Sequence, residues 1–249
     1  MNQLFLMKKI TKTATLFCAS LILMASVSSC KKEASTATAD TVSEEEAAEA
    51  ITQSVSTESG GMTAQSSDAV TVTTDELTSL PCGIEYDSSV SKESVDGAAI
   101  TYACNLAWNW MLSCSNIGVP QKINFNIAGS SSYDAPRMSS DDNSTAAFEI
   151  TGLETSSGEF TLNTNYQRNG TQQSKVLNKN AFTSTITITS TNIVINKITQ
   201  QITSGTASAA ISGASSSGKS FSYSGTITFL GNQKATLTMA SGATYNIAW

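Results

Sequence analysis

Carboxylate side chains are the groups in this chain whose types and spacing come closest to a reactive site. Asp134, Arg137, Asp141, Asp142 and Asn143 fall within ten residues of one another, and we expect them to share one polar loop. Clustered carboxylates bind Ca²⁺, but this spacing lacks the pattern of an EF-hand loop. A solvated loop is therefore the preferred interpretation.

Glu154 and Glu159 flank a predicted turn and are the other carboxylates that could act as a pair. A glycosidase mechanism would require a defined separation between them, so we interpret them as surface charge. The chain has no histidine, which removes the commonest general base, the Ser-His-Asp and Cys-His arrangements, and His-ligated metal sites. We expect a non-catalytic protein with no metal and no cofactor; a hydrolase that works with carboxylates alone is the less favoured alternative.

The segment from Gly213 to Ser220 matches the Walker A pattern in full. A phosphate-binding loop requires a helix after it, so that backbone N–H groups and the helix dipole hold the phosphates. Here Phe221 to Phe229 alternates as a strand, and we expect no nucleotide. Ser216 and Lys219 also fit a Ser-x-x-Lys motif, which fails for the same reason because it needs a helix.

Three cysteines remain in the body of the chain, namely Cys82, Cys104 and Cys114. Cys104 lies on the apolar face of a predicted strand, beside Trp108 and Trp110, where free buried thiols are common. Cys82 follows a proline and Cys114 lies just past a strand end. We therefore predict a disulfide between Cys82 and Cys114, with Cys104 free, and we expect the aromatic side chains to belong to the core.

The elements that must position these residues are strands, because apolar residues alternate along most of the chain. From Val70 onward we expect β structure, with Asn169-Gly170 and Gly231-Asn232 as tight turns and a bulge or turn near Ser190 to Asn192. The polar face is mostly Ser, Thr and Asn; its regular threonine row is Thr183, Thr185, Thr187 and Thr189. No helical period separates the strands, so neighbours should pair in order. The fold class is all-β: an antiparallel meander forming a curled sheet, barrel or sandwich, with a short N-terminal helix.

Acidity marks a segment in front of this β domain. Residues 43–78 form an acidic segment with a short helix, in which Ser43 caps the helix, Glu46 completes a capping box, and Gly60-Gly61 marks a stop. Residues 79–249 form the antiparallel β domain, which is nearly neutral, with ten acidic and nine basic residues. This balance argues against nucleic acid as a partner.

The first residues have the organisation of an export signal. Residues 1–29 contain lysines, a short apolar run and small residues, and they end on Val27-Ser28-Ser29 before Cys30. This motif resembles the lipobox of bacterial lipoproteins. The resemblance implies that Cys30 becomes the first residue and carries a diacylglyceryl group and an acyl chain such as palmitate. Residues 30–42 would then be a flexible tether. Lys31 follows in place of the aspartate that retains some lipoproteins at the inner membrane, which favours the outer membrane, with the body facing either the periplasm or the outside.

The body also resembles the uncharacterised Ser/Thr-rich β domains of lipoproteins from Gram-negative envelopes, a resemblance that implies no activity. The expected role is binding of an envelope protein, a polysaccharide or a lipid ligand. The alternative is a carrier or chaperone for an amphiphile held in the curled sheet. That alternative requires an open groove lined by Phe221, Tyr223, Phe229 and Trp249, and it fails if these side chains are buried.

Overall fold

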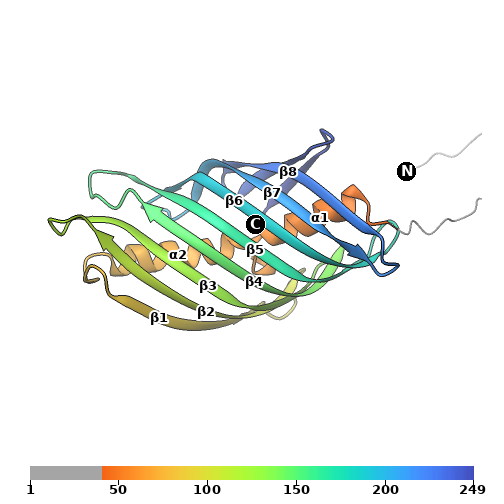
Figure 1. Cartoon of the computed structure of the whole chain (residues 1–249), viewed down its shortest axis with the longest axis horizontal. Coiled ribbons are helices and arrows are strands. Elements are labelled where there is room, and N and C mark those ends of the chain that lie inside the picture. Colours follow the sequence, from red (N-terminus) through yellow and green to blue (C-terminus); the bar gives the residue numbers. More distant parts are fainter. Residues whose placement is uncertain (1–40) are drawn as a thin grey trace, which may run out of the picture. The chain divides into compact units, whose positions relative to one another are not determined.

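The computed structural model describes residues 41–249, which lie within one compact unit. A short helical segment comes first and ten strands follow it (Figure 1). The helical segment consists of α1 (Glu44–Val55), η1 (Thr57–Ser59) and α2 (Met62–Glu76). The strands are β1 (Glu85–Glu93), β2 (Thr101–Cys114), β3 (Pro120–Asp134), β4 (Met138–Thr151), β5 (Glu159–Ser174), β6 (Ala181–Asn196), β7 (Ile202–Ser215), β8 (Ser220–Gly231), β9 (Lys234–Met239) and β10 (Thr244–Ala248).

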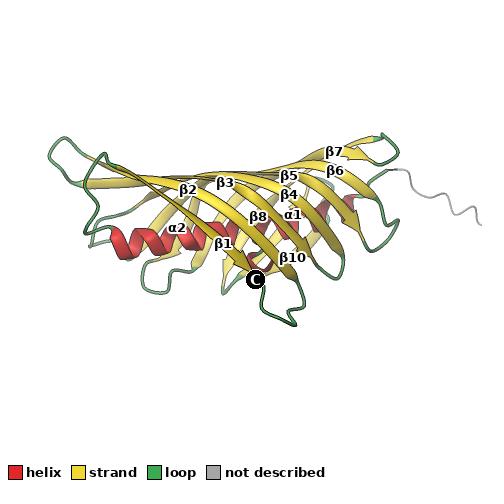
Figure 2. Ribbon diagram, turned by 90° about the horizontal axis from the view of Figure 1, so that it is seen from below, coloured by secondary structure: helices red, strands yellow, loops and turns green. Residues whose placement is uncertain are grey.

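The ten strands form a single sheet in sequence order, and every neighbouring pair is antiparallel. The predicted antiparallel meander is therefore confirmed. The sheet is curled and not closed, so the curled-sheet alternative holds, and β1 and β10 are its two edges. Both helices lie along the concave side of the sheet, as Figure 2 shows.

Alternation along each strand divides the sheet into a buried face and an exposed face. On β2 the buried positions include Cys104, Leu106, Trp110 and Leu112, and the same period continues through β9. The pairing of β6 with β7 shifts register after Thr189, which confirms the predicted irregularity there. Bulges of this kind increase local twist and help a sheet to curl.

The helical segment packs into the curl as part of the same core. Ser43 caps α1 in a complete capping box with Glu46, as the sequence predicts. Ala47, Ile51 and Val55 of α1 are fully buried. The second helix, α2, was not predicted, and the β structure begins at Glu85 rather than at the expected Val70, which is a buried residue of this helix. Within residues 41–249, neither helix is long and apolar enough to cross a membrane.

Two local predictions in the middle of the chain are wrong. Asn169 and Gly170 do not form a turn; they lie inside β5, opposite Asn143 and Asp142. Asp141, Asp142 and Asn143 do not belong to a loop, because β4 begins at Met138 and includes all three. The residues that resemble turn and loop signals thus lie side by side on two paired strands.

Candidate functional site: the convex face of the sheet

The convex face of the sheet carries uncharged side chains in rows that cross the strands. Each row follows the register of neighbouring strands, so its members lie side by side. We name three rows by their first residue. The Asn105 ladder comprises Asn105, Ser130, Asn143, Asn169, Thr185, Ser212 and Ser222. The Ala107 ladder comprises Ala107, Ala128, Thr145, Gln167, Thr187, Ala210 and Ser224. The Asn109 ladder comprises Asn109, Asn126, Ala147, Asn165, Thr189, Ser208, Thr226, Thr238 and Thr244.

These side chains are exposed or half-buried, and several are held in place by their neighbours. The Asn126 amide donates to Asn109 Oδ1 at 3.0 Å within the Asn109 ladder. In the Asn105 ladder the Thr185 hydroxyl donates to Asn169 Oδ1 at 2.7 Å, and the Gln167 amide donates to the same oxygen at 3.1 Å. Such bonds between neighbouring side chains restrict their rotamers before any ligand binds, which lowers the entropy cost of binding.

Charge is confined to the margins of this face. None of the three ladders contains an acidic or basic residue. The pair of Lys122 and Glu149, 2.6 Å apart, lies on one side of them, and its hydrogen bond from Lys122 lowers the pKa of Glu149. Residues 181–249 contain no acidic residue at all, and their lysines lie in turns or at a strand start. The centre of the convex face is therefore neutral and rich in hydrogen-bonding groups.

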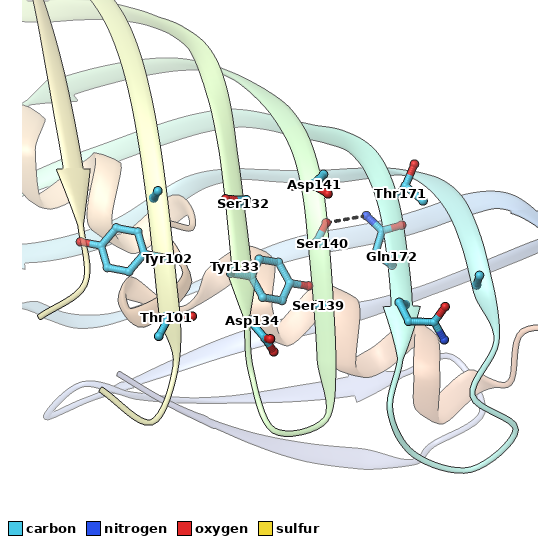
Figure 3. A pocket seen from close by; sticks show the side chains of 13 residues that line it. Thr101, Tyr102, Ser132, Tyr133, Asp134, Ser139, Ser140, Asp141, Thr171 and Gln172 are labelled. Atoms are coloured by element: carbon cyan, nitrogen blue, oxygen red, sulfur yellow. Dashed lines mark hydrogen bonds between the residues drawn. The ribbon is translucent and has the colours of Figure 1, made fainter. Parts of the chain in front are cut away.

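Shallow troughs run between neighbouring rows of this face. One of about 480 Å³ crosses β2 to β6 beyond the Asn105 ladder, where Asp134 and Asp141 are among its lining residues, and it is drawn in Figure 3. Its row of Thr101, Asp134, Ser139, Gln173 and Ala181 follows the strand register. Three more troughs, of about 330 to 720 Å³, lie on the same face of β1 to β6. Adjacent ladders are two residues apart along each strand, so the troughs repeat about every 7 Å.

The four side chains named for an amphiphile groove are buried to different degrees. Phe221 and Phe229 are buried, and Tyr223 and Trp249 are half-buried against the core. The Tyr223 hydroxyl donates to the Val42 carbonyl at 2.9 Å. The helical segment lies along the concave side of the sheet, where such a ligand would be held (Figure 2).

Under the helices lies a buried polar cluster that sequence reasoning missed. Arg168 Nε is 2.7 Å from Asp142 Oδ2, and both side chains are closed off from solvent. The Arg168 guanidinium also donates to the carbonyls of Gln53 and Ser59, at 3.3 and 3.2 Å, and so connects β5 to the helical segment. Its carbon Cζ lies 4.9 Å from the centre of the Tyr133 ring. This arrangement satisfies a buried charge and fixes the helices on the sheet.

The tyrosines of the cluster are unsuited to proton transfer. Burial raises the pKa of Tyr166 to about 12, and burial also raises the pKa of Tyr133. Both phenols therefore stay neutral at physiological pH. The cluster lies beneath the helical segment, so we assign it a structural role rather than a catalytic one.

The other residues predicted from the sequence have definite places, with one exception. Cys82 and Cys114 form a disulfide, which is the predicted pair, and Cys104 is a free, buried cysteine. The Walker-like segment is the end of β7, a turn and the start of β8, with a strand after it as expected. No cluster of potential metal ligands occurs among residues 41–249. Cys30, the predicted lipidation site, lies outside the described residues, as do residues 1–29 and most of the tether.

No protein-family model matches this chain, and no curated protein or solved structure matches it either.

Proposed function

We propose that this protein is a lipid-anchored outer-membrane lipoprotein whose β domain is non-catalytic and binds an uncharged polysaccharide of the cell envelope. The observation that supports this proposal is the convex face, where three uncharged ladders each cross at least six strand pairings; apart from four alanines, their side chains are amides and hydroxyls. The anchor through Cys30 rests on the lipobox resemblance alone.

The chemistry of the ladders suits sugar hydroxyls. Asn, Gln, Ser and Thr side chains each both donate and accept hydrogen bonds, as hydroxyl groups of a glycan do. When a neutral ligand displaces water from a neutral surface, no charged group loses its hydration without gaining a partner. A charged polymer would lose hydration of its own charges and would find no counter-charge on the ladders. The three ladders contain no aromatic side chain, so recognition would depend on many weak hydrogen bonds along a repeating chain rather than on stacking.

Co-sedimentation with an insoluble polysaccharide fraction from the host envelope tests this proposal. We expect the protein to sediment equally at low and high salt, since screening weakens only charge–charge attraction. Binding that disappears as salt rises, or absence of binding to every neutral polysaccharide, would overturn the proposal. Binding that protease treatment of the fraction abolishes would also overturn it, by identifying a protein partner.

A further inference from the structure

A second, smaller cavity lies away from the convex face, between the helical segment and two turns of the sheet. Its volume is about 130 Å³. Thr57 of η1 and Thr63 and Ser66 of α2 line one side. Gln200 from the β6–β7 connection and Gln233 from the β8–β9 turn line the other. It shares no residue with the three ladders.

The polar lining of this cavity is neutral. Each polar side chain around it is an alcohol or an amide, and no acidic or basic side chain contributes. The side-chain amides of Gln201 and Gln233 make no hydrogen bond with another residue in the part of the chain that the structure describes. Their donors and acceptors are thus available to a ligand that forms both kinds of bond.

One wall of the cavity is apolar. Trp249 lines it together with Val70, Ile195 and Ile202. The Trp249 ring packs against the buried ring of Phe229, with centres 6.1 Å apart and planes at 80°. The Trp249 backbone N–H donates to the Gln233 carbonyl at 3.1 Å, and both residues line the cavity. A flat apolar surface beside amide groups suits a ring with one apolar face and a hydroxylated edge.

The backbone at both turns adopts an uncommon conformation. Gln200 has φ of 56° and Gln233 has φ of 58°, in the left-handed region that side-chain-bearing residues rarely occupy. Such conformations cost free energy and often occur where a functional site requires them. Both residues line the cavity, together with Gln201, whose backbone does not adopt this conformation.

We propose that this cavity binds a single neutral polyhydroxylated ring, such as one pyranose sugar or a cyclic polyol. The volume is well below the roughly 300 Å³ of pockets that enclose drug-sized molecules, so one ring fits better than an oligosaccharide. The lining offers no basic side chain to pair with a sugar acid and no acidic side chain to pair with an amino sugar. The inference goes beyond the proposed function and stands on different residues.

Saturation-transfer NMR on the purified full protein tests the site, with methyl glucoside, methyl galactoside and myo-inositol as probes. Glucuronate, which adds a charge, and cyclohexanol, which lacks the hydroxylated edge, serve as matched controls. We expect saturation of at least one neutral probe and of neither control. A response to cyclohexanol equal to that of the neutral probes, or no response to any neutral probe, would overturn the proposal.

Substitutions of the cavity residues test whether the probe binds at this site. Trp249→Ala should raise the Kd of the bound probe by about tenfold or more. Gln201→Ala combined with Gln233→Asn should raise it similarly, and this pair provides the test if Trp249→Ala fails to fold. Asparagine tolerates the left-handed backbone at position 233. Gln121→Ala, an exposed amide on β3, should leave the Kd unchanged. Unchanged affinity in the double glutamine variant would contradict the site.

Discussion

Arg168 and Asp142 form an ion pair inside the curled sheet, with Nε 2.7 Å from Oδ2 and neither side chain accessible to solvent. They lie on neighbouring strands, offset by two positions in the register. Ser131 and Ser140 donate hydrogen bonds to the two oxygens of Asp142. The pair is therefore held from the sheet side, while Arg168 reaches the helical segment on the other side.

Breaking this pair should be strongly destabilising. Arg168→Met leaves the Asp142 carboxylate buried without its counter-charge, and we expect a loss of about 3–5 kcal/mol in the free energy of unfolding. Urea unfolding measures this loss. The double variant Arg168→Met with Asp142→Leu should lose less than the sum of the single variants, since neither charge is then left alone.

The partly exposed pair of Lys122 and Glu149 is the matched control. Its coupling free energy should stay below about 1 kcal/mol, because water screens it. Hydrogen exchange provides a second readout: Arg168→Met should lower protection of α1 and η1 more than protection of β7. Equal coupling in both pairs, or unchanged exchange in α1, would contradict the role assigned to Arg168.

Gly170 should tolerate no side chain. It lies opposite Asp142, and a Cβ there would collide with the Asp141 carbonyl and come within 2.7 Å of Asp142 Cα. Gly170→Ala should therefore force the β4 and β5 backbones apart and lower the thermal unfolding midpoint by several degrees. Gly158→Ala, where a Cβ meets nothing within 4 Å, is the control and should leave the midpoint nearly unchanged. Equal midpoints for the two variants would show that β5 does not need glycine at this position.

Acid should loosen the attachment of α1. Burial opposes ionisation of Glu46, but hydrogen bonds from Ser43 and Asn180 outweigh it and lower the pKa of this carboxyl from its ordinary value. A lowered folded-state pKa adds stability above the unfolded-state pKa, and this stability disappears as the pH falls through the folded-state value. Glu46→Gln should therefore unfold at lower urea than the wild type near neutral pH, and the difference should shrink in acid.

The control for this effect is Glu58→Gln. Glu58 is exposed, and its carboxylate makes no hydrogen bond with another residue in the range 41–249. Its substitution should leave the pH dependence of the urea midpoint as in the wild type. A Glu46→Gln variant whose midpoint falls in parallel with the wild type at every pH would refute the linkage.

Lipidation at Cys30 is testable in the host cell. The wild-type protein should fractionate with membranes and incorporate a fatty-acid label, because two or more acyl chains hold a protein stably at a bilayer. Cys30→Ser should abolish the label and release the protein into the soluble fraction. Cys18→Ser, within the predicted signal, is the matched control. A Cys30→Ser protein that keeps the label would contradict the lipobox interpretation.

Strand positions could be predicted well from the sequence, because alternation is a local property. The alternation of buried and exposed residues around Cys104 and Leu106 follows directly from the pleat of β2, which turns successive side chains to opposite faces. Helix α2 could not be predicted from the sequence because its second half is rich in Thr and Val, which have low helix propensity. Its buried residues Met62, Ala69, Val70 and Thr73 share one side of the helix, and packing against the sheet overrides the local preference.

The two wrong local predictions have a common cause. Asn169-Gly170 is a turn signal in isolation, and the acidic run at Asp141 suggests a loop. The pairing of β4 with β5 overrides both local preferences and places Gly170 opposite Asp142. The partner of Asp142 could be found only once that register was known. The ladders of the convex face could not be predicted either, because each one joins residues that are far apart in the chain and become neighbours only through the strand register.

The most direct test of the account measures binding to a neutral envelope polysaccharide after charge is placed on the convex face. Thr185→Glu, Thr187→Glu and Thr189→Glu together put one carboxylate on each ladder. The control places three glutamates in turns, at Asn116, Thr155 and Ser156, which are exposed and outside the ladders. With thermal midpoints matched, we predict that the ladder variant loses binding while the turn variant retains the affinity of the wild type. Equal binding by the two variants would contradict the claim that the convex face is the binding site.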